Sequence, residues 1–192
     1  MVCSRPLTAA KLEGQTHGSA AAETQPLGGK RENYAEGFRE VQMVSKQGMS
    51  IPEFGSKQDG IVYITRPGVY AVVKNTDKKI AVIETGNGYF LPGGGIEIGE
   101  SDVDALKREI VEEIGYQALI HFEIGEAIEY IDADREAKHY QIHSKFYKVQ
   151  LGSKIVEGVE KDHRLVWLWQ EDAIKLLKRQ GQVWAVQSMI KE

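Results

Sequence analysis

The architecture of this chain depends on the segment from Gly94 to Tyr116, which reads GGIEIGESDVDALKREIVEEIGY. The segment opens in a turn rich in glycine, a residue that permits backbone conformations and close approaches that others resist. From residue 101 to residue 114, apolar side chains recur at the 3.6-residue period of an amphipathic helix. The side chains on this apolar stripe are Val103, Leu106, Ile110 and Ile114. The segment therefore predicts a turn followed by a helix that packs on a core.

Both ends of this helix carry terminal signals. Ser101 can cap the amino-terminal end, and Asp104, three residues later, completes a pair that resembles a capping box. Gly115 suits the carboxyl-terminal stop, where helices often turn into left-handed backbone. We therefore expect Gly115 to have a structural role.

Three carboxylates share one side of the predicted helix. Glu109, Glu112 and Glu113 are spaced i, i+3 and i+4, so they lie together on a helix that turns about 100° per residue. Like charges at this spacing repel, and a divalent cation would offset the repulsion. Mg²⁺ prefers such hard oxygen ligands, and Mn²⁺ accepts them as well. An isolated pair of glutamates would more simply be a solvated acidic face, but the complete pattern favours a metal site.

The residues next to the carboxylates suit the same chemistry. Gly93, Gly94 and Gly95 lack Cβ atoms, so their backbone can approach both a metal and a phosphate closely. We assign Gly94 and Gly95 to substrate binding. Arg108 can orient a glutamate through a two-pronged hydrogen bond.

Taken together, these residues resemble the Nudix box. That pattern reads Gly, five residues, Glu, seven residues, Arg-Glu, an aliphatic residue, any residue, Glu-Glu, any residue, Gly and a final aliphatic residue. The positions that match are Gly94, Glu100, Arg108, Glu109, Ile110, Glu112, Glu113 and Gly115. Tyr116 stands where the family has Ile, Leu or Val, at a position used for packing. The resemblance extends from about residue 50 to residue 192 and implies an α/β fold, the Nudix-type α/β/α sandwich with a mixed β-sheet.

The resemblance also implies roles for individual residues. Glu112 and Glu113 would bind Mg²⁺, with the carbonyl of Gly93 as a further ligand. Glu109 would be a ligand or the base that activates water, with Arg108 assisting in catalysis, and Glu100 would be structural. Many relatives add an acidic residue from a late loop, for which Glu160 is the candidate. A solvated loop glutamate is an equal alternative for Glu160.

Composition divides the chain into residues 1–48 and residues 49–192. The first part is rich in Gly, Ala, Ser, Thr and Gln and buries too little to fold alone, so we interpret it as a poorly structured extension or leader. In the second part, runs of β-branched and aromatic residues predict strands. These runs cover 61–65, 69–74, 80–84, 117–130, 140–151 and 165–169. Helical patterns near Glu171 and Val183 close the chain, which predicts a sheet covered on two faces.

The charge and the cysteine content of the chain limit the classes of binding partner and the cellular compartment that we expect. The formal net charge of -4, with signs interleaved, favours neither duplex nucleic acid nor an anionic membrane as a partner. No apolar run approaches the ~20 residues of a membrane span. The single cysteine, Cys3, excludes an internal disulfide framework and, with no signal-peptide pattern, indicates the cytoplasm. Whether the protein is a monomer or a homodimer stays open.

The box leaves the substrate undetermined, because substrate choice resides in loops outside it. We expect a small nucleotide and interpret the chain as a MutT-like (d)NTP pyrophosphohydrolase, since markers of other subclasses are missing or displaced. The alternatives are an ADP-ribose or dinucleoside polyphosphate hydrolase and a non-catalytic nucleotide-sensing Nudix module. An enzyme that acts on capped or triphosphorylated RNA ends is a further alternative.

Overall fold

The computed structural model describes residues 50–133, 138–158 and 162–189. The chain divides into two units, residues 1–45 and 46–192, and all described residues belong to the second unit. The predicted extension over residues 1–48 therefore lies outside the described residues and stays a prediction. Within the described ranges, no helix is long and apolar enough to cross a membrane.

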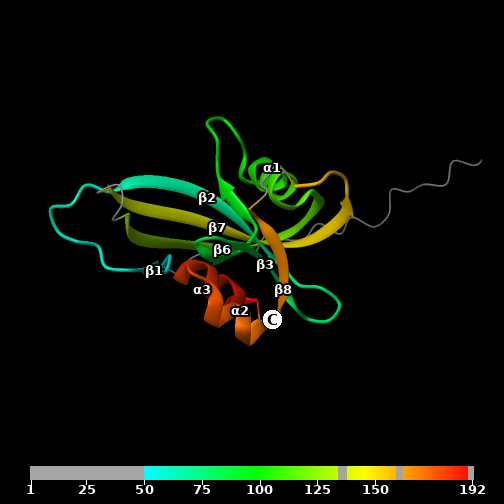
Figure 1. Ribbon diagram of the computed structural model, residues 1–192. Coiled ribbons are helices and arrows are strands. Elements are labelled where there is room, and N and C mark those ends of the chain that lie inside the picture. The colour runs from blue at the N-terminus through cyan, green and yellow to red at the C-terminus, as the bar shows by residue number, and fades with distance from the viewer. Residues whose placement is uncertain (1–49, 134–137, 159–161, 190–192) are drawn as a thin grey trace, which may run out of the picture. The chain divides into compact units, whose positions relative to one another are not determined.

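A five-stranded mixed sheet forms the centre of the second unit (Figure 1). Its strands, in spatial order, are β1 (Glu53–Phe54), β6 (Tyr116–Ala133), β7 (Lys138–Lys154), β2 (Ile64–Val73) and β5 (Gly93–Gly95). β1 runs parallel to β6, and β2 runs parallel to β7, whereas the β6–β7 and β2–β5 pairs are antiparallel. A second, antiparallel sheet has the order β4 (Gly88–Phe90), β3 (Ile80–Thr85) and β8 (Arg164–Leu168).

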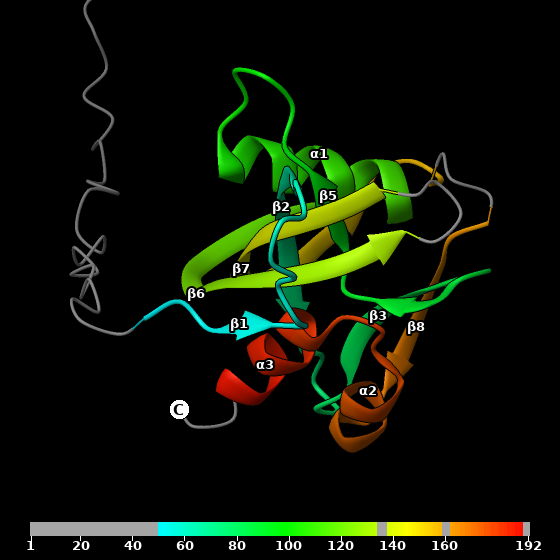
Figure 2. The same cartoon turned by 90° about the vertical axis from the view of Figure 1, so that its left-hand side faces the viewer.

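Helices cover both faces of the central sheet, as Figures 1 and 2 show. α1 (Asp102–Ile114) lies on one face, and α2 (Gln170–Leu176) and α3 (Gln180–Ser188) lie on the other. This arrangement confirms the predicted α/β/α sandwich with a mixed sheet.

The sandwich has two hydrophobic cores, one on each side of β2. Val69, Ala71 and Val73 join the core under α1, whereas Val72 joins the core under α2 and α3. Successive strand residues point to opposite faces, so one buried strand supplies both cores. The stripe predicted on α1 does lie inward, because Leu106 and Ile110 are fully buried in the first core.

Pairing between distant segments changes two of the predicted strand boundaries. The separate runs expected at 61–65 and 69–74 form the single strand β2, whose ladder with β7 continues through Pro67 and Gly68. The glycines expected to form only a turn include the short strand β5, which pairs with β2 over Gly68 to Tyr70. Local composition does not predict the full length of either strand, because the strands that pair with them lie elsewhere in the chain.

The two ends of α1 follow the sequence signals closely. Ser101 Oγ accepts a hydrogen bond from the Asp104 backbone N–H at 3.2 Å and donates to the Asp104 carboxylate at 2.6 Å. At the other end, Gly115 adopts left-handed backbone with φ 77° and its N–H donates to the carbonyl of Val111 at 2.9 Å. A Cβ atom on Gly115 would collide with the carbonyl oxygen of Val156.

This collision predicts that Gly115→Ala destabilises the fold by more than left-handed backbone alone explains. Gly60→Ala is a matched control, because Gly60 has the same φ of 77° with nothing within 4 Å of an added Cβ. We expect Gly60→Ala to cost about 1 kcal/mol, and Gly115→Ala to cost roughly 1–3 kcal/mol more. Urea unfolding of both variants measures the difference, and equal losses would show that the Val156 contact is unimportant.

Candidate functional site

The site lies where the polar edge of α1 meets β5. β5 is anchored to the central sheet by its pairing with β2, in a register that places Gly93 opposite Tyr70. α1 packs against both β5 and β2, as Figure 2 shows. The helix therefore holds its glutamates over a short strand made only of glycine.

Arg108 connects the acidic residues at the centre of this site. Its Nε and Nη2 atoms donate to the two oxygens of Glu100 at 2.9 Å each, which is the bidentate geometry of an arginine–carboxylate pair. Its Nη1 atom donates to Glu109 at 2.8 Å and to Glu112 at 3.0 Å. Nη2 also donates to the carbonyl oxygen of Gly95 at 3.0 Å. One guanidinium thus binds three carboxylates and the backbone of β5.

These hydrogen bonds also shift proton affinities. The bonds from Arg108 lower the pKa of Glu100, and the same bonds, with those to Glu109 and Glu112, raise the pKa of Arg108. Glu100 therefore stays a carboxylate and Arg108 a cation around neutral pH. Glu100 also accepts a hydrogen bond from the Glu97 N–H at 3.2 Å, which ties the preceding loop to the helix.

The glycines of β5 are required by close contacts. Gly93 has φ 134°, and a Cβ there would collide with the carbonyl oxygen of Val69 in β2. At Gly94 the obstacle is a side chain instead, because a Cβ would lie 2.5 Å from the carboxylate of Glu109. Gly95 has open space beside it, so its part in the site is its carbonyl oxygen.

Glu113 is the buried member of the carboxylate cluster, with 8% of its surface exposed. One oxygen accepts a hydrogen bond from the Gly93 N–H at 2.9 Å. The other lies 3.2 Å from Nδ1 of His163, the residue just before β8. His163 was not predicted from the sequence, where only acidic residues of this loop were considered as ligands. No spacing signal could have linked two residues fifty positions apart.

The charge balance of the cluster favours a bound cation. Among the described residues, the carboxylates of Glu100, Glu109 and Glu112 accept hydrogen bonds from Arg108, and that of Glu113 accepts one from the backbone N–H of Gly93 in β5. Carboxylates are the hard oxygen donors that Mg²⁺ prefers, and the missing side chain of Gly94 leaves the Glu109 oxygens accessible from β5. The donor set therefore fits a divalent cation.

The side chains point to their protein partners rather than to one common centre. Among the described residues, no three His, Cys, Asp or Glu side chains are arranged to hold a metal ion. Of the three glutamates in the described ranges that form ion pairs with Arg108, Glu112 is the most exposed, with 47% of its side chain accessible. A cation bound by Glu112 would therefore require that side chain to turn away from Arg108. The predicted ligand Glu160 lies outside the described residues.

Comparisons with known proteins agree with this fold. A family model described as NUDIX domain matches residues 64–187. A NUDIX hydrolase from Nitrosomonas europaea has 19% sequence identity and a TM-score of 0.53, covering 67% of this chain and 90% of that one. A MutT protein from Methanosarcina mazei Go1 has 14% identity and a TM-score of 0.54, covering 67% and 95%.

A third solved structure is the E. coli dihydroneopterin triphosphate pyrophosphohydrolase, with 16% identity and a TM-score of 0.53, covering 68% and 98%. At these identities the structural similarity establishes the fold alone. A comparison with curated proteins finds no match.

The contact at Gly94 predicts a local displacement in Gly94→Ala. The added Cβ would push the Glu109 carboxylate away by roughly 1 Å, the difference between the 2.5 Å contact and an ordinary van der Waals separation. Gly95→Ala is the neighbouring control, because nothing lies within 4 Å of its added Cβ. Crystal structures of the two variants measure the shift, and an unmoved Glu109 in Gly94→Ala would contradict the contact.

Proposed function

The chain belongs to the NUDIX domain family, and from that premise we propose that it is a Mg²⁺-dependent pyrophosphohydrolase. Its substrate would be a nucleoside diphosphate derivative, and we favour a (d)NTP of the MutT type. The single observation that carries this proposal is the cluster in which Arg108 binds Glu109 and Glu112 beside the glycine strand β5. An intact cluster of this kind argues against a nucleotide sensor that has lost catalysis.

We assign Glu112 and Glu113 as metal ligands, with the carbonyl of Gly93 completing the protein donors. Glu113 is suited to this role because its oxygens are already oriented by the Gly93 N–H and by His163. Hydrogen bonds of this kind fix a ligating carboxylate before the metal binds. A bound divalent cation would neutralise phosphate charge and acidify the attacking water.

The proposed reaction is hydrolysis of the phosphoric anhydride bond, in which water displaces one phosphate group from the phosphorus of its neighbour. Oxygen of the water bonds to phosphorus, the bridging P–O bond breaks, and the bond electrons leave with the departing phosphate. Glu109 takes the proton from the water as general base, or serves as a ligand beside Glu112 and Glu113. Arg108 keeps Glu109 in place. The backbone of Gly94 and Gly95 would lie against the substrate phosphates.

The proposal places the protein in the cytoplasm, acting on small nucleotides without duplex nucleic acid or membrane as partner. Hydrolases of ADP-ribose, dinucleoside polyphosphates or RNA 5′ ends share the same box chemistry and differ in what surrounds it. A substrate screen distinguishes them directly. It should contain nucleoside triphosphates, oxidised triphosphates, ADP-ribose, dinucleoside polyphosphates and capped RNA.

The decisive variant is Glu112→Gln, assayed with Mg²⁺ on every substrate of this screen. Loss of a ligand charge should lower kcat/KM by at least about 100-fold, the scale of the several kcal/mol that a correctly held cation contributes. Glu171→Gln, an exposed substitution on α2, is the matched control and should leave the rate unchanged. EDTA should abolish turnover, and Mn²⁺ should restore part of it.

A readout without turnover separates metal binding from catalysis. Mn²⁺ titration followed by electron paramagnetic resonance should show one site in the wild-type protein, weakened in Glu112→Gln and retained in Glu171→Gln. If wild type and Glu112→Gln hydrolyse every substrate equally and bind Mn²⁺ equally, the catalytic assignment is wrong.

A further inference from the structure

His163 connects the buried carboxylate of α1 to the second sheet. Its Nδ1 atom lies 3.2 Å from one oxygen of Glu113, and 22% of the histidine side chain is exposed. An ionised carboxylate only accepts hydrogen bonds, so Nδ1 is the atom that carries the hydrogen. Both side chains also line a pocket at the carboxyl-terminal end of α1. Their contact therefore borders open space rather than lying inside the hydrophobic core.

The position of His163 is set by the strand that follows it. β8 pairs antiparallel with β3, and the register places Arg164 opposite Glu84. Nε of Arg164 donates to the Glu84 carboxylate at 2.7 Å, and the Tyr89 hydroxyl donates to the same carboxylate at 2.9 Å. The residue next to His163 is thus held by backbone pairing and by side-chain hydrogen bonds. None of the strands in this sheet belongs to the segment that carries the box, so the imidazole contacts α1 from an independent element.

Two contacts of Glu113 involve different oxygens. One oxygen accepts from the Gly93 N–H at 2.9 Å, and the other faces Nδ1 of His163. The last torsion of a glutamate side chain is broad, so a carboxylate held at one oxygen can still turn about its final bond. Contacts at both oxygens restrict that rotation. They do not exhaust the carboxylate, because its two oxygens offer about four acceptor positions.

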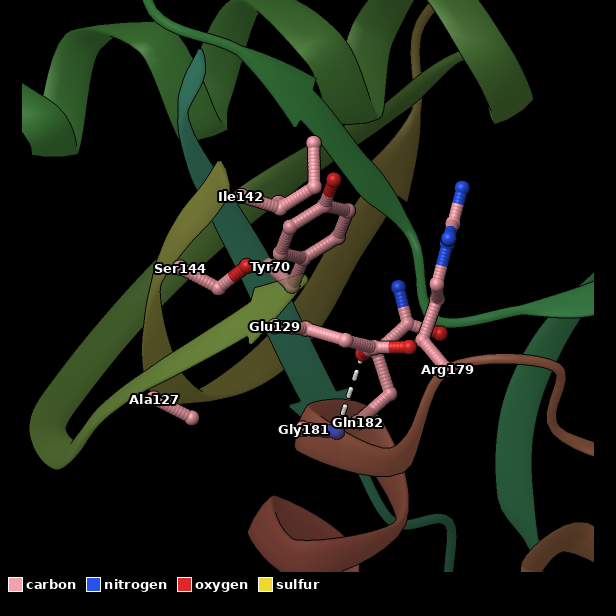
Figure 3. Close-up of a pocket in the computed structure, with 8 residues that line it drawn as sticks. All are labelled: Tyr70, Ala127, Glu129, Ile142, Ser144, Arg179, Gly181 and Gln182. Carbon is pink, nitrogen blue, oxygen red and sulfur yellow. Dashed lines mark hydrogen bonds between the residues drawn. The ribbon is translucent and has the colours of Figure 1, made fainter. Parts of the chain in front are cut away.

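Glu129, on the opposite face of the central sheet, shows what a structural contact requires (Figure 3). One of its oxygens accepts a hydrogen bond from the Gly181 N–H at 3.2 Å, which satisfies a free amide at the start of α3. Satisfying the Gly93 amide explains one contact of Glu113 in the same way. It does not explain the contact with His163, which brings a side chain from the second sheet to the other oxygen.

Resting on the proposed function, we propose that His163 is a positioning residue for the metal site. It fixes the carboxylate plane of Glu113, so this ligand has little rotation to lose when a divalent cation binds. Side chains that hydrogen-bond a metal ligand in this way typically contribute about 10- to 100-fold in metal affinity. The affinity of the box for its metal then depends on β8, through a residue that no spacing within the box specifies.

A charge effect would have the opposite sign. If His163 acted mainly as a cation that neutralises Glu113, it would compete with the metal for the same carboxylate. Removing it would then strengthen metal binding. The direction of the change therefore distinguishes a positioning residue from a counter-ion.

Two substitutions separate the hydrogen bond from the bulk of the side chain. In asparagine, as in histidine, a nitrogen is bonded directly to Cγ, so His163→Asn keeps an N–H donor close to the position of Nδ1. His163→Leu is also branched at Cγ but has no donor. We expect His163→Leu to weaken Mn²⁺ binding by about 10- to 100-fold and His163→Asn to retain most of the affinity. Electron paramagnetic resonance of Mn²⁺ without substrate measures both.

His139→Leu is the matched control. His139 pairs with Asp132 through the same ring atom, Nδ1, at 2.6 Å, at the opposite end of the β6–β7 ladder from Tyr116. The substitution removes a histidine–carboxylate contact of the same kind away from the site, so it should leave the Mn²⁺ affinity unchanged. Thermal unfolding without metal measures the stability of each variant by itself. Added Mn²⁺ should raise the Tm of His163→Leu less than that of wild type, because weaker binding stabilises less.

Kinetics give a second readout on whichever nucleotide the protein hydrolyses. The Mg²⁺ concentration for half-maximal activity should rise in His163→Leu by a factor comparable to the loss of Mn²⁺ affinity. The KM for the nucleotide at saturating Mg²⁺ should change little. A higher KM with unchanged Mn²⁺ affinity would show that His163 contacts the substrate instead, and the positioning role would be wrong.

The outcomes separate this inference from the function on which it rests. Equal Mn²⁺ affinity in wild type and both His163 variants, or tighter binding in His163→Leu, overturns the positioning role and leaves the proposed hydrolase standing. Equal weakening in His163→Leu and His163→Asn also overturns it, since the donor would then be irrelevant. His163→Ala, which lacks the donor as well, takes the place of His163→Leu if that variant fails to fold. Weaker Mn²⁺ binding in His163→Leu alone, in a protein that hydrolyses no substrate of the screen, supports the positioning role and overturns the proposed activity.

Discussion

The fork of hydrogen bonds from Arg108 is the interaction on which this site depends. Glutamates at i, i+3 and i+4 on α1 repel one another, and an arginine one residue before the first of them supplies the opposing charge. Because the same guanidinium also binds Glu100 and the Gly95 carbonyl, it attaches the helix to the loop before it and to β5. Lysine could not replace it, since an ammonium group lacks the planar fork that meets several acceptors at once.

The hydrogen bonds of Arg108 to both α1 and β5 require the helix to lie close to the strand. The approach requires glycine at two positions for different reasons, since Gly93 must clear the backbone of β2 and Gly94 must clear the Glu109 carboxylate. On the other side of the helix, Leu106 and Ile110 fill the core against β2. Burial of its apolar side thus positions the helix on the sheet, and the hydrogen bonds of Arg108 position its polar side. Together they hold the carboxylates beside the glycine backbone in one defined arrangement.

The opposite face of the sheet packs against a different pair of helices, α2 and α3. β2 supplies residues to both faces, and Tyr70 directs its ring to the side of α2 and α3. The bond between Gln182 and the Leu91 N–H ties α3 to the chain just before the glycine strand.

The amino-acid sequence by itself determined the features that are local. The helix over residues 102–114, its caps at Ser101 and Gly115 and the grouping of its glutamates all follow from spacing within a few turns. The layered fold followed from the alternation of strand and helix patterns. The sequence could not show that β2 runs unbroken through Pro67, that β5 is a strand, or that His163 contacts Glu113, since each depends on a distant partner. Tertiary structure alone decided those pairings. Contacts between distant segments are selected by the packing of the whole sheet, and they leave no periodic signal along the chain.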